Sequence, residues 1–257
     1  MRFGIISDIH GNLVALKAVM HGLERAGYDQ LICLGDVVGY GPDPAACLDF
    51  VREHDAIMVR GNHEEALCQP AMARCFNENA RIAIEWTRNR MISERPELLR
   101  EVSRFSGMAY IGNRIMCVHD TPSPSGTTYL TNGHAAAHAF SGVDASICLV
   151  GHTHVPVCFR APRDSDGKLG VHASQVETFS PDGQSSIELD AQSRWIINPG
   201  SVGQPRDGDV RASAAVLDLG KASLSWLRME YDIAEAQHRA EAVGLPSSSA
   251  LRLSIGA

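Results

Sequence analysis

Five short segments of this chain carry side chains that bind divalent metal ions. The segments are Asp8-Ile9-His10, Gly35-Asp36, Gly61-Asn62-His63-Glu64, His119 and Gly151-His152-Thr153-His154. Carboxylates and imidazoles together suit Mn, Fe, Zn, Co or Ni better than Mg or Ca, which prefer shells of oxygen ligands. Asn62 offers only its amide oxygen, a neutral ligand that limits the charge on its metal. These residue types predict a metal site built from several parts of the chain.

Two metal ions about 3.5–4 Å apart need a bridging ligand and further ligands on each flank. Asp36 is the natural bridge, because a carboxylate at a strand end can bind both ions. Asp8 and His10 are two residues apart, so the chain must turn between them for both to face a metal. Gly11 makes that turn plausible. The spacing therefore favours a pair of ions.

His152 and His154 are also two residues apart, after Gly151, and could serve different ions. The remaining histidines lie outside such motifs, and we expect them to be ordinary loop or core side chains. They are His21, His54, His134, His138, His172 and His238. The candidate site is therefore confined to the five motif segments.

Each motif follows a short apolar run that predicts a β-strand. The runs lie at residues 3–7, 31–34, 56–60, 114–118 and 146–150. Between the first three runs, apolar residues recur at helical spacing from Leu13 to Leu23, and Asp43-Pro44 resembles the start of a second helix. This β-α-β-α-β alternation predicts a largely parallel sheet with helices on its faces. Because the motifs all come at strand ends, we expect them to form one active site.

The rest of the chain predicts a helical insert and further strands. Residues 64–110 are largely helical in pattern, so we expect two or three helices packed beside the site. Residues 160–194 are polar and predict hairpins at a sheet edge. Residues 195–198, 211–219 and 223–231 are predicted to complete a second set of strands, with antiparallel pairing, that packs as a second sheet against the first. No linker divides residues 1–257, so we predict a single domain with a mobile tail after about residue 244.

The composition is that of an ordinary globular protein, with 44% hydrophobic and 21% charged residues. The net charge of -7 argues against a dedicated nucleic-acid binder, which would show a basic face. No apolar run approaches about 18 residues and the N-terminus lacks a signal-peptide pattern, so we expect no membrane association. The seven cysteines include no Cys-x-x-Cys pair, and four lie in apolar runs. They predict buried thiols and a cytoplasmic location.

In their order along the chain, the motifs resemble those of the calcineurin-like metallophosphoesterase superfamily. The segment Asn198-Pro-Gly-Ser-Val-Gly-Gln-Pro-Arg-Asp-Gly is similar to that of its small bacterial and archaeal phosphodiesterase branch. The resemblance spans residues 1 to about 232. It implies an α/β fold, a four-layer α/β/β/α sandwich of two packed mixed sheets, with a dinuclear metal centre between the loops of the two sheets.

The resemblance also implies a role for each motif residue. One ion would be held by Asp8, His10 and His154, the other by Asn62, His119 and His152, with Asp36 as the bridge. His63 would bind no metal and would act as the general acid. The ions would be two divalent transition metals, with Mn as the first choice and Fe, Ni, Co or Zn as alternatives. One departure is Asp120, where relatives often have glycine; a carboxylate there could orient an imidazole or repel an anionic substrate.

This constellation predicts hydrolysis of a phosphoester. Two cations would polarise the phosphoryl oxygens and lower the pKa of a bridging water, and the hydroxide would attack phosphorus in line. His63 would protonate the leaving oxygen, a task suited to its intrinsic pKa near 6.5. Arg206 is a candidate ligand of a substrate phosphate oxygen, although it could equally be an exposed or salt-bridged loop arginine. Arg60 has a weaker claim to that role.

Several functions share this centre. We favour a phosphodiesterase acting on a small nucleotide-like or cyclic substrate. A phosphomonoesterase or protein phosphatase, and a hydrolase of dinucleoside polyphosphates, remain alternatives, because specificity lies in the loops at 64–110, 120–142 and 160–194. A binding scaffold, as in a retromer subunit, is disfavoured because every ligand position is filled. Stable binding of nucleic acid is disfavoured by the acidic charge, and no pattern indicates the oligomeric state.

Overall fold

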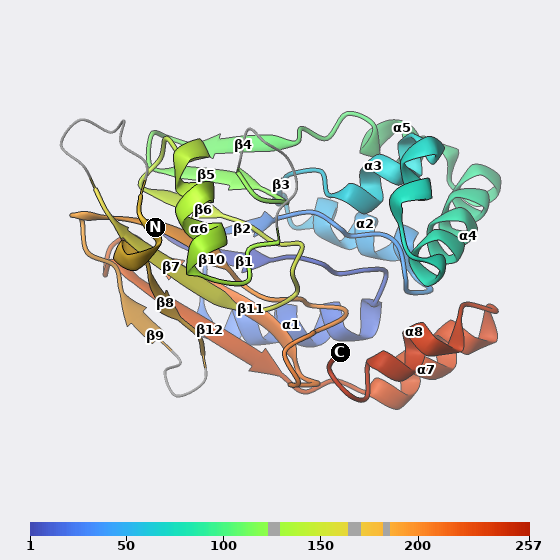
Figure 1. Cartoon of the computed structure of the whole chain (residues 1–257). Helices are drawn as coiled ribbons and strands as arrows, with labels where there is room; N and C mark the ends of the chain where they lie inside the picture. The colour runs from blue at the N-terminus through green and yellow to red at the C-terminus, as the bar shows by residue number, and fades with distance from the viewer. Residues whose placement is uncertain (123–128, 164–170, 182–185) are drawn as a thin grey trace.

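The computed structural model describes residues 1–122, 129–163, 171–181 and 186–257, so parts of two of the loops named above lie outside it. Two six-stranded sheets pack face to face with helices on their outer faces (Figure 1). The strand orders are β3-β2-β1-β11-β12-β9 and β4-β5-β6-β10-β7-β8. This arrangement is the four-layer α/β/β/α sandwich that the motifs predict, and the fold class is confirmed.

The first sheet is built from β1 (Arg2–Ile6), β2 (Gln30–Cys33), β3 (Ile57–Met58), β9 (Ser186–Glu188), β11 (Ala212–Asp218) and β12 (Ser223–Met229). The second sheet is built from β4 (Met108–Ile111), β5 (Ile115–Val118), β6 (Ile147–Leu149), β7 (Val157–Pro162), β8 (Glu177–Phe179) and β10 (Ser193–Asn198). Both sheets are mixed. β1 pairs in parallel with β2 and antiparallel with β11, while β10 pairs in parallel with β6 and antiparallel with β7.

The α-helices are α1 (Leu13–Ala26), α2 (Pro44–Glu53), α3 (Asn62–Cys68), α4 (Glu78–Glu94), α5 (Pro96–Val102), α6 (Gly133–Ala139), α7 (Ile233–Ala242) and α8 (Ser247–Arg252). Short 3-10 helices lie at Pro70–Cys75, Ala173–Gln175 and Phe140–Gly142. Helix α1 shows why such a segment folds: Asn12 caps it by accepting from the Ala15 N–H at 3.0 Å, and Gly27 ends it at a φ of +78°.

Alternating side chains divide the core between the layers. Phe3 and Ile5 of β1 point between the two sheets, where they join Ile115 and Trp195 of the second sheet in one cluster. Ile6, the residue after Ile5, packs instead with the outer cluster, which contains the buried face of α1. Each sheet is therefore buried on both faces, and this rigid frame holds the strand ends that carry the motifs.

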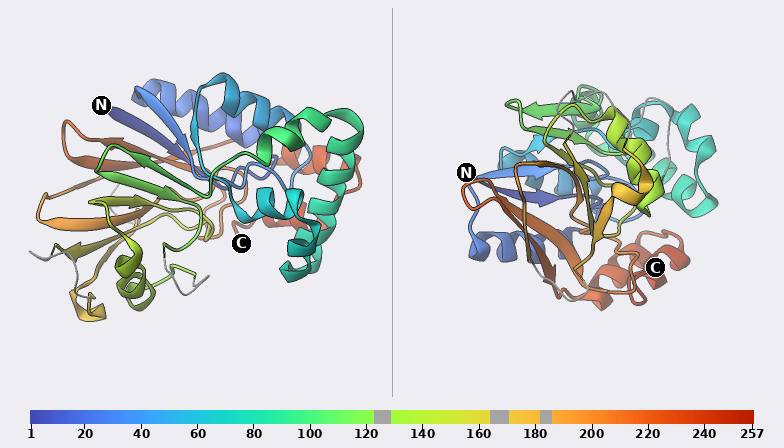
Figure 2. Two further views of the ribbon diagram at one scale, coloured as in Figure 1. Left: turned by 90° about the horizontal axis from the view of Figure 1, so that it is seen from above. Right: turned by 60° about the vertical axis from the view of Figure 1, so that its left-hand side comes forward.

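Helices α3–α5 and α7–α8 gather at one end of the two sheets. In Figures 1 and 2, α3–α5 and α7–α8 lie at the end where β1 and β2 finish, while the N-terminus lies at the opposite end. Within the described ranges, no helix is both long and apolar enough to cross a membrane. The motif loops are thus enclosed by helices from two distant parts of the chain.

Three details differ from the sequence predictions. β11 and β12 extend the sheet of β1–β3 while β10 joins the other sheet, because alternation predicts a strand but not its partner. The segment 64–110 ends in a strand, β4, which pairs antiparallel with β5. Of the hairpin region at 160–194, β7 and β8 pair in the second sheet, whereas β9 pairs with β12 in the first.

The segment expected to be a mobile tail instead forms helix α8. Ala250 is buried in one cluster with Ala83 of α4 and Ala240 of α7. The segment therefore packs on an apolar surface formed by two other helices, which its own serine-rich sequence does not indicate. Further along, the carbonyl of Gly256 accepts a bond of 2.9 Å from the Gly208 N–H, in a loop before β11. The division of the chain into one domain stays a prediction.

Candidate active site

The carboxyl ends of four strands bring the predicted residues together. Asp8 and His10 follow β1, Asp36 follows β2, and His119 follows β5. His152 and His154 follow β6, and Asn62 and His63 open α3 beyond β3. Backbone hydrogen bonds connect the loops. The His10 N–H donates to the Asp36 carbonyl at 2.9 Å, and the Gly151 N–H donates to the His119 carbonyl at 2.8 Å. All eight motif residues therefore meet in one place.

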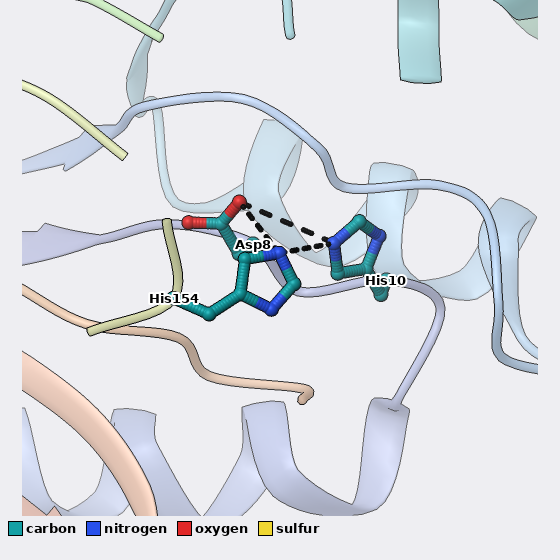
Figure 3. A group of neighbouring side chains, drawn as sticks. All are labelled: Asp8, His10 and His154. Atoms are coloured by element: carbon teal, nitrogen blue, oxygen red, sulfur yellow. Dashed lines mark hydrogen bonds and ion pairs between the residues drawn. The ribbon is translucent and has the colours of Figure 1, made fainter. Parts of the chain in front are cut away.

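One group of possible metal ligands contains Asp8, His10 and His154, all buried (Figure 3). His154 Nε2 lies 3.3 Å from Asp8 Oδ1, and His10 Nε2 lies 4.0 Å from the same oxygen. The two Nε2 atoms are 3.1 Å apart. Three ligand atoms from two loops thus converge on one point.

A second group contains Asp36, His119 and His152, and Asn62 joins it. His119 Nε2 lies 3.2 Å from Asp36 Oδ2 and 3.1 Å from Asn62 Oδ1. His152 Nδ1 lies 2.9 Å from the same Asn62 oxygen. The predicted ligands of the second ion are therefore also brought together.

Asp36 lies between the two groups. Its Oδ2 is 3.2 Å from His119 Nε2 on one side and 3.8 Å from His10 Nε2 on the other. Its Oδ1 accepts the backbone N–H of His63 at 2.9 Å, which fixes the orientation of the carboxylate. Oδ2 is thus the atom placed to bridge two ions.

The ring nitrogens test whether these residues fit a metal. His10 Nδ1 faces the Val38 carbonyl at 3.0 Å, and His154 Nδ1 faces the Gln204 carbonyl at 2.6 Å. A carbonyl only accepts, so each Nδ1 must donate, and in the neutral rings each Nε2 is then a lone pair. Two lone pairs only 3.1 Å apart repel each other unless a cation lies between them. The donor set therefore fits a bound metal ion.

The backbone supports this interpretation. Eight non-glycine residues among those the structure describes have φ in the left-handed region, and five are predicted ligands. These five are Asp8, His10, Asp36, His152 and His154, with φ between 50° and 68°. Such conformations cost about 1–3 kcal/mol each and concentrate where surrounding structure enforces a functional geometry. The turn expected between Asp8 and His10 is made by the ligands themselves.

Protonation preferences of the metal-free site follow from burial and neighbouring charges. Burial raises the pKa of Asp8 to about 7 and lowers the pKa of His10 and His154 well below the usual range. Burial also disfavours charge on His119, but the charges of Asp36 and Asp8 and the bonds to Asp36 and the Leu34 carbonyl together outweigh burial and raise the pKa of His119 to about 10. A positive charge beside the carboxylates is thus favoured, while the imidazoles of the first group stay neutral, as metal ligands must.

Glu64 is a buried positioning residue that the motif analysis left without a role. Its carboxylate accepts from the N–H groups of Asp36 at 2.7 Å, Gly61 at 2.9 Å and Val38 at 3.1 Å. Burial raises the pKa of Glu64 to about 7, and the backbone donors oppose that rise. The signal was present in the sequence, since a carboxylate in the first turn of a helix commonly binds backbone N–H groups.

A loop after β10 supports Asp8 from below. The backbone carbonyl of Asp8 accepts from the Ser201 hydroxyl at 2.8 Å and from the Gly203 N–H at 2.9 Å, and both donors belong to this loop. The same loop supplies the Gln204 carbonyl that orients His154. The segment singled out for its resemblance to one family branch therefore positions ligands of the first group.

His63 lies beside the predicted ligands with its ring buried. The ring packs against His10, Tyr40 and Phe76 at centroid distances of 4.7, 5.0 and 4.6 Å. Its Nδ1 is buried without a hydrogen-bond partner. Burial lowers the pKa of His63 to about 4, although Asp36 opposes that shift, so the free site holds a neutral imidazole at pH 7. The intrinsic value used in the sequence argument does not apply in this environment.

A cavity of about 380 Å³ opens over the motif residues of both groups. Its lining includes Arg206 and five motif residues, which are Asp36, Asn62, His63, His152 and His154. Nε of Arg206 is buried without a partner, while its Nη2 donates to Gln204 at 2.7 Å. A guanidinium with an unused donor at the wall of such a cavity suits an anion.

Aromatic side chains complete the wall. Tyr129 stacks on the ring of His152 at 4.7 Å and 18°, and Phe76 and Tyr40 flank His63. None of the three was predicted from the sequence. Tyr40 and Phe76 come from loops without motif spacing, so only the folded chain places them at the site.

Comparisons with known proteins point in one direction. Residues 1–222 match a family model described as a calcineurin-like phosphoesterase superfamily domain. The crystal structure of a metallophosphoesterase from Sphaerobacter thermophilus has 36% identity and a TM-score of 0.83, covering 100% of this chain and 99% of its own. An uncharacterized protein of Methanocaldococcus jannaschii is 32% identical over 253 residues, 98% of this chain and 97% of its own. Phosphodiesterase YfcE of Escherichia coli is 34% identical over 79 residues, 27% of this chain and 43% of its own.

Proposed function

The chain belongs to the calcineurin-like phosphoesterase superfamily and is a hydrolase of phosphoric esters, and from that premise we propose that it is a dinuclear metal-dependent phosphodiesterase. Its substrate in this proposal is a small nucleotide-like or cyclic diester. The similarity to phosphodiesterase YfcE over 79 residues supports the choice of a diester. The main support for a diester is the negative charge of Asp120, which lines the cavity.

Asp120 lines the same cavity as Asn62, and its charge acts on the neighbouring His152. A phosphomonoester carries close to two negative charges at pH 7, because its second pKa lies near 6. A diester carries one. A carboxylate beside the phosphoryl group therefore repels a monoester more strongly than a diester. Asp120 is the observation on which the preference for diesters rests.

The proposed ligands follow the two groups. Asp8, His10 and His154 would hold one ion, Asn62, His119 and His152 would hold the other, and Asp36 would be shared between them. The donor set of imidazoles and carboxylates suits Mn²⁺ first, with Fe, Co, Ni or Zn as alternatives. Bound ions would supply positive charge to the phosphoryl oxygens and a hydroxide for in-line attack on phosphorus.

The chain's own groups complete the reaction. Arg206 donates its unpartnered Nε–H to a non-bridging phosphoryl oxygen and holds the substrate in the cavity. His63 protonates the leaving oxygen, and a bound phosphoester anion favours the charged imidazole that this step needs. Tyr40 and Phe76 hold the His63 ring in place and exclude water around it.

The cellular setting is part of the same proposal. All seven cysteines are unpaired, which is typical of a protein in a reducing compartment such as the cytoplasm. We propose a small soluble substrate as the only partner that the site requires.

The test compares bis-p-nitrophenyl phosphate with p-nitrophenyl phosphate in Mn²⁺, for wild type, His63→Ala and His21→Ala. We expect the diester to be preferred, His63→Ala to lose most of the rate, and His21→Ala, an exposed substitution on α1, to behave as wild type. A preference for the monoester would favour a phosphatase. Inactivity on both, with stoichiometric metal bound, would point to polyphosphate nucleotides, and failure to bind metal would revive a scaffold role.

A further inference from the structure

A second cavity, of about 560 Å³, adjoins the site on another side of Asn62. Four residues line both this cavity and the one beside His63: Asn62, Glu65, Met72 and Asp120. His119, a predicted ligand, lines only the second cavity. The phosphoryl position therefore borders two separate spaces, of which the mechanism so far uses one.

The geometry of displacement assigns one space to each arm of a diester. His63 and Arg206 line only the first cavity, so the leaving alcohol, which needs the proton from His63, lies there. In an in-line displacement the second ester arm is one of the equatorial substituents of phosphorus, so it extends in a different direction from the leaving alcohol. Asn62 and His119 open directly into the second cavity, which offers that arm a continuous path.

The walls of the second cavity indicate the chemistry of this arm. Three methionines line it, and two of them, Met72 and Met108, are 42% and 41% exposed, unusual for large apolar side chains. Thioethers pack well against the edges and faces of aromatic rings. Arg60 also lines the cavity, and a guanidinium can stack on such a ring. The volume lies in the range of ordinary small-molecule sites.

The charged residues of the second cavity further limit which group it can bind. Glu65 and Asp120 contribute two carboxylates to the lining, against the single guanidinium of Arg60. A second phosphate in this cavity would face net negative charge, so a neutral group fits better than a polyphosphate arm.

We propose that the second cavity binds the non-leaving alcohol of the diester, and that this alcohol carries a neutral, flat aromatic ring such as a nucleobase. The inference rests on the proposed phosphodiesterase function and narrows its substrate class. It makes the lining of the second cavity, rather than the metal centre, the determinant of which diesters are hydrolysed.

Gly107 offers a clean way to test this. A Cβ at this position meets nothing within 4 Å and the backbone is not left-handed, so Gly107→Trp can fill the cavity without backbone strain. Gly107→Ala is the matched control, because it makes the same backbone change without the bulk. Met108→Ala, which removes part of the wall, is a second variant that does not depend on how tryptophan packs.

The substrates share p-nitrophenol as the leaving group and differ in the second arm: methyl, phenyl or thymidine-5′-yl. For wild type we expect kcat/KM to rise by about tenfold or more from the methyl to the aromatic arms. Gly107→Trp should abolish that gain and leave the methyl diester within about twofold, and Met108→Ala should reduce the gain. Gly107→Ala should match wild type.

Two results would overturn the inference: a wild-type rate that does not depend on the second arm, or a tryptophan variant that keeps the full gain. A uniform loss on all three diesters in Gly107→Trp, with Met108→Ala unchanged, would also count against it. Absence of turnover for every diester in wild type, with p-nitrophenyl phosphate hydrolysed, would instead refute the proposed phosphodiesterase and the inference with it.

Discussion

The two predicted ion sites differ in how completely the protein encloses them. Asp8, His10 and His154 are at most 2% exposed. Both imidazoles of that site are anchored through Nδ1 to backbone carbonyls. Asn62 and His152 of the other site are only half-buried and face the substrate cavity. His154 also lines that cavity, so the contrast is one of degree: we call the more deeply buried site closed, and the site with the half-buried Asn62 and His152 open.

The difference in burial predicts different roles for the two ions. A closed site with anchored ligands holds its ion tightly, while an open site keeps room for substrate oxygens. His152 directs Nδ1 to the site, and its ring is held by stacking on Tyr129 at 4.7 Å. We therefore expect the ion of the open site to exchange faster.

Asp36→Asn should remove the contrast altogether, because Asp36 faces both groups. The substitution keeps the size of the side chain but removes the charge that two cations share. We expect kcat for bis-p-nitrophenyl phosphate to fall by more than about 100-fold and both ions to bind more weakly. Kinetics and elemental analysis of metal after gel filtration measure this. Asp29→Asn, at the surface, is the control, and two retained ions with normal turnover would refute the bridging role.

His10→Asn and His152→Asn should separate the two sites. We expect His152→Asn to retain about one ion per chain after gel filtration, because the closed site is intact. His10→Asn should lose the tightly held ion, and both variants should lose about 100-fold or more in kcat. Metal analysis gives the readout, with His238→Asn as the control. Equal metal content in the two variants would contradict the difference between the sites.

Graded removal of metal should show the same order in the wild-type protein. We expect low chelator concentrations to abolish activity with little change in melting temperature, as the open site empties. Higher concentrations should then lower the melting temperature by about 5–10 °C, because a tightly bound ion stabilises only the folded state. Differential scanning fluorimetry and activity follow the titration. Simultaneous loss of activity and stability at one concentration would show that the ions leave together.

Asp120→Asn should alter substrate preference only mildly, since a partly exposed carboxylate acts through high-dielectric surroundings. We expect kcat/KM for p-nitrophenyl phosphate to rise about fivefold relative to the diester. The effect should shrink in high salt, because the interaction is electrostatic. Glu188→Gln on β9 provides a distant control. An unchanged ratio at low salt would remove the main support for a diester over a monoester.

The convergence of the candidate ligands could be predicted from the sequence because strand ends position them. Asp8, Asp36 and His119 each follow a buried apolar run by one or two residues. Once β1 pairs in parallel with β2, and β5 with β6, the side chains that follow must lie at one edge. The local pattern therefore specified most of the geometry.

The open side could not be predicted in the same way. Phe76 and Tyr129 lie in segments whose course depends on how the helical insert and the loop after β5 pack, and neither has a periodic neighbour. The sheet membership of β11 and the burial of Ala250 likewise depend on partners far along the chain. Long-range packing, not local propensity, decided these features.

The bond between Gly208 and Gly256 bears on how the protein should be handled at the bench. Gly208 lies two residues after Arg206, so the last turn of the chain holds the loop that carries the proposed phosphate ligand. A purification tag fused behind Ala257 would begin two residues beyond Gly256, and we expect it to disturb this hydrogen bond and the loop that it holds. Met1 is 61% exposed at the opposite end of the sheets (Figure 1), so affinity handles and fluorescent fusions belong there.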